Sequence, residues 1–409
     1  MSSAERRWRR PLAAACLAGT LAGGLAGCGS GGGATAAAAV VPPVGTAAGH
    51  TLGVTVNGAR CSAGAYVNKP CVRVTVCAPG TTTCQAVDDV LLDTGSYGLR
   101  IFRQALPLAL PAVTVPAGPL ATCVQFADGA SDWGPVVQAS VQLGDAAPVT
   151  TPIQVIDAGY GTVPAACPSP EGSPAAAGLN GVLGVGPFLQ DCGAACERSA
   201  ANGLYFACGA TGCTGAAVPL ASQLQNPAAL LPGLSNGLVV DLPAVGAGGA
   251  ASADGVVLFG IDASADTTPA GVTVYPLDGS GNLVDQVAGV VGRGFLDTGS
   301  NGLFFAPPAG SGLTACTGAG AGWLCPATTV SLSAAFRTGA GALGPATSFQ
   351  VANFDQLVGT GHAVFPDLGG GAVAGLGFDW GLPFHLGRKV YLGFEGRSSS
   401  LGAGPYVAF

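Results

Sequence analysis

The sequence predicts a mainly β protein made of two related lobes, and three observations support this fold class. Charged residues make up only 9% of the 409 residues, whereas glycine contributes 68 and proline 30. Short β-branched runs separated by Gly, Pro, Asn and Asp recur along the chain, as expected of strands joined by turns. A segment around Asp93 also recurs almost unchanged around Asp297. Since a chain of this length exceeds what one hydrophobic core usually serves, we expect two lobes of roughly 150 to 200 residues.

The N-terminal segment carries an export signal rather than part of the fold. A basic stretch ending at Arg10 precedes an apolar run over 12–25, the order of charge and hydropathy in a secretory signal. Leu25-Ala26-Gly27-Cys28 matches the bacterial lipoprotein box. We therefore predict a lipoprotein signal peptide at 1–27 and lipidation of Cys28, which would hold the protein stably at a membrane. An ordinary signal peptide with an incidental cysteine is the alternative.

A tether and two lobes are predicted to follow the signal. Residues 28–50 contain no Lys, Arg, Asp or Glu, a composition typical of a flexible tether. The N-terminal lobe, which includes a cysteine-rich connector over 190–235, is predicted at 51–235, and the C-terminal lobe at 236–409. The clearest strand patterns lie at 54–56, 72–76, 136–143, 237–242, 256–261, 272–275 and 389–394. The best helix candidate is 219–231.

The cysteines indicate disulfides formed in an oxidising compartment. Of 14 cysteines, Cys16 lies in the signal and Cys28 at the lipidation site, so the remaining 12 allow up to six bridges. Two pairs that bracket short turns are the clearest candidates: Cys77 with Cys84, and Cys316 with Cys325. Four further cysteines could bind zinc in principle, at 192, 196, 208 and 213. Their spacing lacks the usual C-x2-C pairs, and export favours disulfides.

Charge and the remaining polar residues exclude other function classes. With 15 basic and 22 acidic residues the net charge is −7, which argues against a polyanionic partner such as nucleic acid. No stretch after the signal has the length and apolarity of a transmembrane helix. We expect the histidines at 50, 362 and 385 to be solvated or packed rather than catalytic.

The repeated segment is the strongest indication of a site. Residues 92–99 and 296–303 differ at one position, where Tyr97 is replaced by Asn301, and each copy follows an apolar strand. A lone Asp-Thr-Gly-Ser is usually only a turn, but two copies in matched contexts predict duplicated lobes. The predicted catalytic residues are Asp93 and Asp297. The predicted supporting residues are Thr94, Gly95, Ser96, Thr298, Gly299 and Ser300.

Paired carboxyl groups at such loops favour acid–base chemistry. Glycine lets the backbone pass close to the partner loop, and the Thr and Ser hydroxyls can orient each carboxylate. If the loops meet, Asp93 and Asp297 cannot both ionise easily, so the pair would share one proton over a wide pH range. One member can then take a proton from water while the other donates one. This chemistry needs no metal and no cofactor.

A second echo completes the pattern and carries a family resemblance. Val182-Leu183-Gly184 follows the first acid loop, and Asp379-Trp380-Gly381 follows the second at a nearly equal distance. With these motifs, the sequence resembles the pepsin-like aspartic proteases over about 52–409, and residues 255–262 look like the strand that opens that family's C-terminal lobe. The resemblance implies a bilobal fold with the two acid loops facing each other across a cleft.

A narrower resemblance and two departures qualify this assignment. Residues 379–388 and the lipoprotein box resemble an uncharacterised family of bacterial lipoproteins with paired Asp-Thr-Gly loops, which has no assigned substrate. Pepsin-like enzymes close the cleft with a Tyr-bearing hairpin, the flap, whose best match here is 126–134. Phe126 lacks a hydroxyl, and Trp133 could supply an indole N–H instead or simply pack. A basic pro-segment is also missing, because 29–59 contain no Lys or Arg.

Aromatic side chains near the loops are candidates for the pocket walls. These are Tyr66, Tyr97, Phe304 and Phe305, and packing in the lobe core is the competing interpretation for Phe304 and Phe305.

The expected function is an envelope-anchored aspartic endopeptidase that binds an extended peptide or protein substrate and hydrolyses it through Asp93 and Asp297. The alternative is a non-catalytic lipoprotein on the same fold that binds, or inhibits through binding, a peptide or protein. We expect a monomer held at the membrane by its lipid. Gly29 follows Cys28 where an Asp would favour the inner membrane, so outer-membrane attachment is expected.

Overall fold

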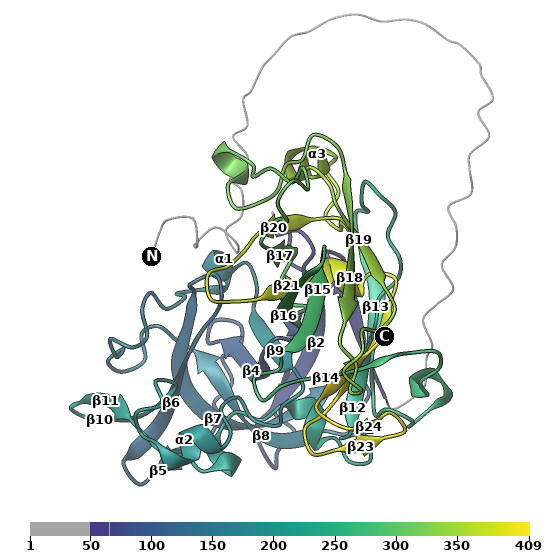
Figure 1. Cartoon of the computed structure of the whole chain (residues 1–409). Coiled ribbons are helices and arrows are strands. Elements are labelled where there is room, and N and C mark those ends of the chain that lie inside the picture. The colour runs from purple at the N-terminus through teal and green to yellow at the C-terminus, as the bar shows by residue number, and fades with distance from the viewer. Residues whose placement is uncertain (1–49, 65) are drawn as a thin grey trace, which may run out of the picture.

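The computed structural model describes residues 50–64 and 66–409. The predicted signal peptide, Cys28 and the tether up to residue 49 lie outside the described residues. The described chain is mainly β, as predicted, with one long sheet and a second, seven-stranded sheet (Figure 1). Helices are few and short, and none in the described part is long and apolar enough to cross a membrane.

The long sheet contains most strands of the first half of the chain and several of the second. Its order is β11 (Gly212–Gly215), β10 (Tyr205–Gly209), β6 (Gly118–Gln125), β7 (Ser131–Leu143), β8 (Val149–Ile156), β4 (Tyr97–Phe102), β9 (Gly181–Val185), β3 (Cys84–Asp93), β2 (Pro70–Cys77), β1 (Thr51–Val56), β13 (Ala253–Phe259), β12 (Gly237–Asp241), β22 (Lys389–Gly393), β25 (Tyr406–Ala408) and β14 (Val274–Pro276), with β5 (Thr114–Val115) beside β6. An additional pairing of β2 with β7 closes part of this sheet into a barrel.

The second sheet belongs wholly to the second half of the chain. Its order is β19 (Thr347–Val351), β18 (Val330–Phe336), β15 (Leu283–Val287), β16 (Val290–Leu296), β21 (Phe378–Trp380), β17 (Leu303–Phe305) and β20 (Gly369–Gly371). Strands β23 (Ser398–Ser399) and β24 (Gly402–Ala403) form a separate small hairpin. The helices are α1 (Pro174–Ala177), α2 (Ala194–Arg198), α3 (Phe354–Gly359) and α4 (Leu382–His385), and the 3₁₀ turns are η1 (Leu220–Ser222), η2 (Pro227–Leu230), η3 (Ala265–Thr267) and η4 (Gly318–Gly320).

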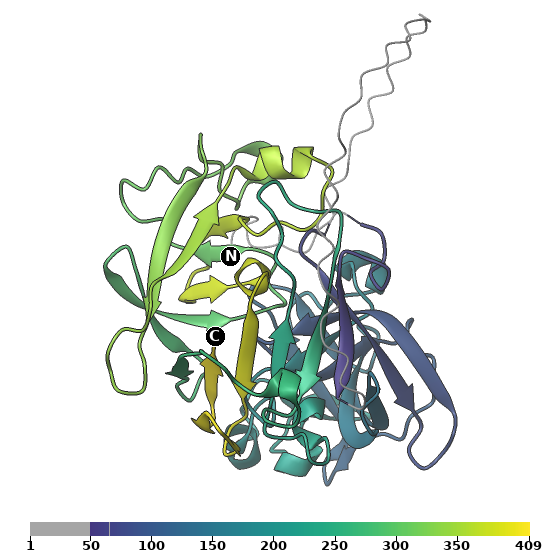
Figure 2. The same ribbon diagram turned by 90° about the vertical axis from the view of Figure 1, so that its right-hand side faces the viewer.

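Strand β1 joins the two halves of the chain. It pairs antiparallel with β13, from Thr51 opposite Leu258 to Val56 opposite Ala253, and pairs with β2 on its other side. Figure 2 shows the purple and blue first half to one side of this junction and the green and yellow second half to the other. The long sheet therefore continues across the boundary predicted at 235/236.

Each acid loop follows a strand that lies in the same local arrangement. Strand β3 pairs parallel with β9, with Leu92 opposite Leu183, and β9 pairs antiparallel with β4. In the second sheet β16 pairs parallel with β21, with Leu296 opposite Trp380, and β21 pairs antiparallel with β17. The two sequence echoes therefore mark strands that occupy equivalent places next to the acid loops.

The strand patterns agree with the structure, whereas the predicted helix was wrong. Six of the seven predicted strands coincide with or lie largely within observed ones, and the seventh, 272–275, overlaps β14 only at 274–275. Residues 219–231 form only η1 and η2, because Pro227 has no N–H to continue a helix and Asn226 before it adopts an extended backbone, φ −66° and ψ 109°. Asn226 instead caps η2 by accepting the N–H of Ala228.

Apolar packing and disulfides stabilise both halves. One cluster of buried side chains runs from Val54 and Leu92 in the first half to Phe336 and Trp380 in the second. All cysteines of the described residues pair, as Cys61–Cys71, Cys77–Cys84, Cys123–Cys167, Cys192–Cys196, Cys208–Cys213 and Cys316–Cys325. Both predicted turn bridges are confirmed, and the cysteines weighed as zinc ligands form disulfides instead.

Candidate active site

The two acid loops hold their carboxyl groups in the same way. In the first, Gly95 N–H donates to Asp93 Oδ1 at 2.7 Å and Ser96 Oγ donates to Asp93 Oδ2 at 2.5 Å. In the second, Gly299 N–H donates to Asp297 Oδ1 at 2.7 Å and Ser300 Oγ to Asp297 Oδ2 at 2.8 Å. Each tetrapeptide thus supplies both the carboxyl group and the donors that orient it.

The two threonines bind the loops to each other. Thr94 N–H donates to Thr298 Oγ1 at 3.1 Å, and Thr298 N–H donates to Thr94 Oγ1 at 3.0 Å. Each hydroxyl then donates across to the partner strand, Thr94 Oγ1 to Leu296 O at 3.0 Å and Thr298 Oγ1 to Leu92 O at 2.7 Å. Since both threonines are buried, this reciprocal set replaces water completely and fixes the separation of the loops.

The glycines allow each carboxyl group to lie against the opposite loop. A Cβ placed on Gly95 would lie 2.8 Å from Cγ of Asp297, and one on Gly299 would lie 2.9 Å from Cγ of Asp93. No side chain could therefore replace either glycine without moving a carboxyl group. The carboxyl groups of Asp93 and Asp297 also hydrogen-bond to each other, so the structure brings together all eight predicted residues of the two loops.

Burial and like charge favour a retained proton on this pair. The pKa of Asp297 is raised well above its ordinary value, first by burial and then by the negative charges of Asp93 and Asp379. The hydrogen bond with Asp93 acts in the same direction, and donation from Ser300 opposes it. Two buried carboxyl groups in contact titrate as a unit with one shared proton.

A cavity of about 60 Å³ lies over the pair. Its walls come from both halves of the chain, and include Asp93, Asp297, Asp379, Tyr66, Phe126 and Phe304. This volume has room for a water molecule beside the two carboxyl groups.

The hairpin between β6 and β7 lies at that rim. Phe126 N–H donates to Ala130 O, and Ala130 N–H donates to Asp128 Oδ1 at 2.9 Å, which closes the turn. Phe126, Ala127 and Asp128 line the cavity. Trp133 does not, because its ring is fully buried against Phe206 and its indole N–H donates to Tyr160 O at 2.8 Å. Of the two flap candidates, only Phe126 is at the cavity, and the indole role considered for Trp133 was wrong.

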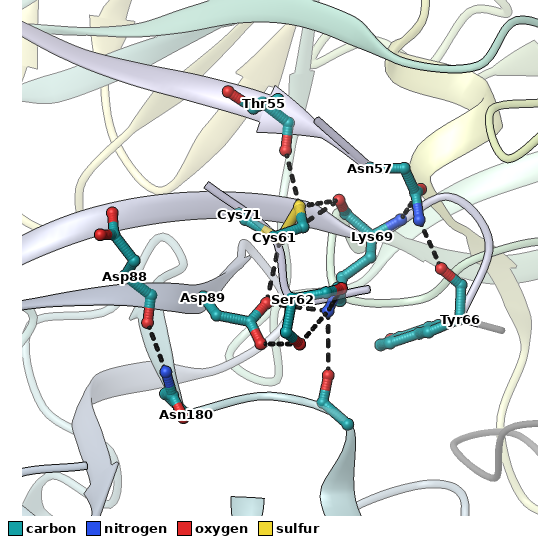
Figure 3. A network of polar contacts seen from close by, with 11 residues as sticks. Thr55, Asn57, Cys61, Ser62, Tyr66, Lys69, Cys71, Asp88, Asp89 and Asn180 are labelled. Carbon is teal, nitrogen blue, oxygen red and sulfur yellow. Dashed lines mark hydrogen bonds and ion pairs between the residues drawn. A yellow bond between two sulfur atoms is a disulfide. The ribbon is translucent and has the colours of Figure 1, made fainter. Parts of the chain in front are cut away.

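Tyr66 is a second aromatic wall and comes from the loop between β1 and β2. Its hydroxyl donates to Gly299 O at 3.0 Å, so a side chain of the first half contacts the second acid loop directly. Asn57 Nδ2 donates to Tyr66 O at 2.5 Å, and Lys69 N–H donates to Asn57 Oδ1 at 2.8 Å. Figure 3 shows these contacts at the base of the loop.

A buried ion pair stabilises the same loop. Lys69 Nζ lies 2.8 Å from Asp89 Oδ1, with both side chains almost inaccessible, and also donates to Gly178 O at 3.0 Å (Figure 3). Ser62 Oγ donates to the other oxygen of Asp89. The disulfide Cys61–Cys71 closes the loop beside them. The position of Tyr66 at the cavity thus depends on a rigid, internally paired support.

Asn68 attaches this loop to the second half. Its Nδ2 donates to Asn301 O at 2.8 Å and to Phe365 O at 2.9 Å, while its Oδ1 accepts the N–H of Phe365 at 2.7 Å. The side chain is fully buried. Because Asn301 follows the second acid loop, Asn68 helps to place that loop relative to the first half.

The other predicted wall residues separate into two groups. Phe304 lines the cavity, and Tyr97 lines a neighbouring pocket of about 200 Å³ with Thr94 and Gly95. Phe305 belongs to the core, where it stacks on Phe378 at 4.5 Å between ring centroids. The predicted histidines at 50, 362 and 385 do not line the cavity, and His385 is fully buried.

Two clusters of side chains of the metal-ligating types occur in the described part of the chain, but their cysteines are not free to bind a metal. Among the described residues, the two clusters of suitable side chains are Cys61, Cys71 and Asp89, and Cys316, Cys325 and Asp355. In both, the cysteines form a disulfide and so lack the thiolates that bind metals.

Sequence reasoning missed three residues of the site: Asn68, Lys69 and Asp379. Asp379 was noted only as part of the second echo, although a carboxyl group between Phe378 and Trp380 in a buried strand is unusual. The signal for Lys69 was similar, since lysines are rare in this chain and this one adjoins a strand. Nothing in the sequence identified Asp89 or Asn301 as the partners.

Comparison with known proteins adds a family but no activity. The model of a family described as "Protein of unknown function (DUF3443)" matches residues 46–409. The chain belongs to this family, and the match includes both acid loops and Asp379. A search of the curated proteins found no match to the chain.

Proposed function

We propose that this member of the family is an aspartic endopeptidase with a bilobal pepsin-like fold, in which Asp93 and Asp297 activate water to hydrolyse a peptide bond. The proposal includes export and attachment to the cell envelope, on its outer membrane, through a lipid on Cys28. The even set of disulfides supports export to an oxidising compartment.

One observation carries the proposal. Two copies of the same loop, Asp-Thr-Gly-Ser, contact each other reciprocally and present hydrogen-bonded carboxyl groups to one cavity. A structural role would need only the threonine contacts. Burying two carboxyl groups against each other opposes folding unless they share a proton, and such costly pairs are typical of catalytic sites.

The reaction follows from the protonation of the pair. In the proposed mechanism the shared proton is assigned to Asp297, whose pKa is raised by burial and by neighbouring charges, and Asp93 is the carboxylate that accepts. Asp93 takes a proton from a bound water while the water oxygen attacks the peptide carbonyl carbon, and Asp297 protonates the carbonyl oxygen. In the second step the proton on Asp93 passes to the amide nitrogen and the C–N bond breaks. A hydroxyl of the intermediate returns a proton to Asp297, which restores the starting state.

A non-catalytic binding function is the second candidate, and the narrow cavity favours it. With about 60 Å³ free among lining residues that include Tyr66 and the β6–β7 turn, the site offers little free volume for a peptide. A protein that binds or inhibits its partner through the outer rim would not need to open.

The test measures cleavage of unstructured peptides by the full chain carrying Cys28→Ser. This change should move the protein from the membrane fraction to the soluble one, which checks the anchor. We expect activity to be highest at acidic pH. Asp93→Asn and Asp297→Asn should each lower kcat by roughly 10²-fold to 10⁴-fold, the typical share of a general acid or base.

Asp254→Asn, at an exposed position of β13, is the matched control and should leave kcat unchanged. Lack of cleavage from pH 3 to 8 by a folded protein would overturn the peptidase proposal. If Asp93→Asn/Asp297→Asn also restored the function of a deletion strain, the binding alternative would be favoured.

A further inference from the structure

Asp379 is the third carboxyl group at the cavity and breaks the symmetry of the two halves. Strand β3 places Leu91 opposite Val182 of β9, and β16 places Phe295 opposite Asp379 of β21. The equivalent positions are therefore occupied by a valine in the first half and by an aspartate in the second. Val182 packs in an apolar cluster, whereas Asp379 lines the cavity with Asp93 and Asp297.

The surroundings of Asp379 are unfavourable for a charge. Its side chain is 3% exposed, and Oδ1 is buried without a hydrogen-bond partner. Ser300 is also a hydrogen-bond neighbour of Asp379. Its hydroxyl donates to Asp297 Oδ2 at 2.8 Å, and since it has one proton it donates to only one of the two carboxyl groups at a time. Ser300 thus connects Asp379 to Asp297, while Ser96 in the first half has only a valine at the corresponding place.

Among the described residues, the cavity lining contains no Lys, Arg or His. The titratable groups in that lining are Asp93, Asp128, Asp297, Asp379 and Tyr66. On α4, which follows β21, His385 is fully buried and its pKa is lowered to about 3, mainly by burial, so it is neutral. Arg388 lies beyond it, over the ring of Phe384.

Of the other neighbouring elements, β16 carries Arg293, an exposed side chain that lies 3.3 Å from Asp278, whereas β15 and β4 carry acidic or neutral groups. Asp285 on β15 accepts the indole N–H of Trp380 at 3.0 Å. Tyr97 on β4 has a raised pKa, chiefly through burial and then through the charges of Asp93, Glu395 and Asp297, so it is neutral too. A negative charge on Asp379 therefore acts on the proton of Asp297 with no basic side chain of the described cavity lining between them.

We infer that Asp379 is a positioning residue for the proposed aspartic pair: through Ser300 and through its own charge it keeps the shared proton on Asp297 as the pH rises toward neutrality. This inference rests on the proposed function. It assigns the acid to the second loop and the base to the first, although the two loops have nearly the same sequence. It also widens the pH range of activity on its alkaline side, because activity ends there when Asp297 loses its proton.

The directions of the pKa shifts of Asp379 and Asp297 agree with this inference. Burial, followed by the charge of Asp93, raises the pKa of Asp379 well above its ordinary value, against donation from Ser300. The charge of Asp379 in turn contributes to the raised pKa of Asp297. Asp297 and Asp379 therefore both keep a proton to higher pH than an exposed aspartate does.

The experiment compares pH profiles of kcat/KM for the Cys28→Ser chain and for Asp379→Asn, which keeps the shape and the contact with Ser300. We expect the alkaline limb to move down by about one pH unit or more, which is roughly a tenfold loss of kcat/KM on that limb, as removal of a neighbouring charge implies.

Asp379→Val, which introduces the residue of the first half, should move the limb in the same direction and serves if the asparagine variant does not fold. Asp367→Asn is the control, because Asp367 is also a buried carboxyl group but lines a different pocket. An active, folded Asp379 variant whose alkaline limb coincides with that of the parent would overturn the inference. An inactive parent would instead overturn the proposed function, so the two failures are distinguishable.

Discussion

Burial sets the protonation of individual carboxyl groups in the second sheet. Asp285 is 3% exposed, and its pKa is raised by burial against the hydrogen bond from Trp380. A carboxyl group with a raised pKa in the folded state binds more protons there than in the unfolded state, so its contribution to stability falls as the pH rises through that window. The same logic applies to Asp297 and Asp379, which makes Asp285 a test outside the proposed pair.

Asp285→Asn should therefore gain stability relative to the parent between pH 4 and pH 7. The asparagine can still accept from Trp380 but takes up no proton on folding, so the difference in unfolding free energy should shift by up to about 1.4 kcal/mol per pH unit. Urea denaturation at the two pH values measures it.

Asp278 provides a comparison, because its pKa is shifted in the opposite direction from that of Asp285. Although burial acts to raise its pKa, the backbone N–H groups of Asn282 and Ser280 lower it overall. Asp278→Asn should lose stability relative to the parent as the pH rises from below into the ordinary range of aspartate, and the difference should stay constant above that range. Parallel pH dependence of all three proteins would contradict the assignment of burial as the dominant cause at Asp285.

At the scale of elements, the loop between β1 and β2 places Tyr66 at the cavity. Its support is the buried pair of Lys69 and Asp89, with Asn57 and Asn68 on either side. A buried charge left without its partner is strongly destabilising, whereas loss of both charges costs less.

We expect Lys69→Met to lower the unfolding free energy by about 3 to 5 kcal/mol, and Lys69→Met/Asp89→Asn to recover part of the loss. Asparagine suits this position because residue 89 has φ +57°. The exposed pair Arg73–Asp88, between β2 and β3, is the matched control, and Arg73→Met should cost less than about 1 kcal/mol. Equal losses for both lysine and arginine variants in urea denaturation would argue against the buried pair as the support.

At the scale of the whole molecule, the two halves share one sheet and one core. Strand β1 inserts between β2 and β13, with Leu52, Val54 and Val56 almost completely buried. The threonine contacts and Asn68 add further links across the same junction. Opening one half would therefore expose apolar surface and unpaired strand edges of the other.

The halves should accordingly unfold together. Hydrogen exchange followed in increasing urea should show that peptides covering β3–β4 and β16–β17 lose protection at the same denaturant concentration. Val54→Pro removes an N–H in the middle of β1, should cost about 3 kcal/mol or more, and should separate the two transitions. Separate transitions in the unaltered protein would contradict a single cooperative unit.

Local patterns in the sequence were sufficient for much of the fold and for the composition of the site. Alternating β-branched residues and turn residues predicted the strands, because these preferences act within a few neighbours. Cysteines on either side of a short turn predicted Cys77–Cys84 and Cys316–Cys325, since a turn brings its ends together. The repeat identified Asp93 and Asp297 with their Thr, Gly and Ser neighbours, because a duplicated segment can be detected by comparing the sequence with itself.

Only the tertiary structure decided which distant residues surround the two loops. Asp379 reaches the cavity through the parallel pairing of β21 with β16, and Tyr66 through a loop fixed by Lys69 and Asp89. Trp133 does not line the cavity, because it is buried and its indole N–H donates to Tyr160 O. These outcomes depend on pairings between segments far apart in the chain, where many arrangements have similar local preferences and packing selects one. The sequence by itself thus determined the two matched acid loops and the β class, and the tertiary structure decided that a third carboxyl group lies beside them on one side only.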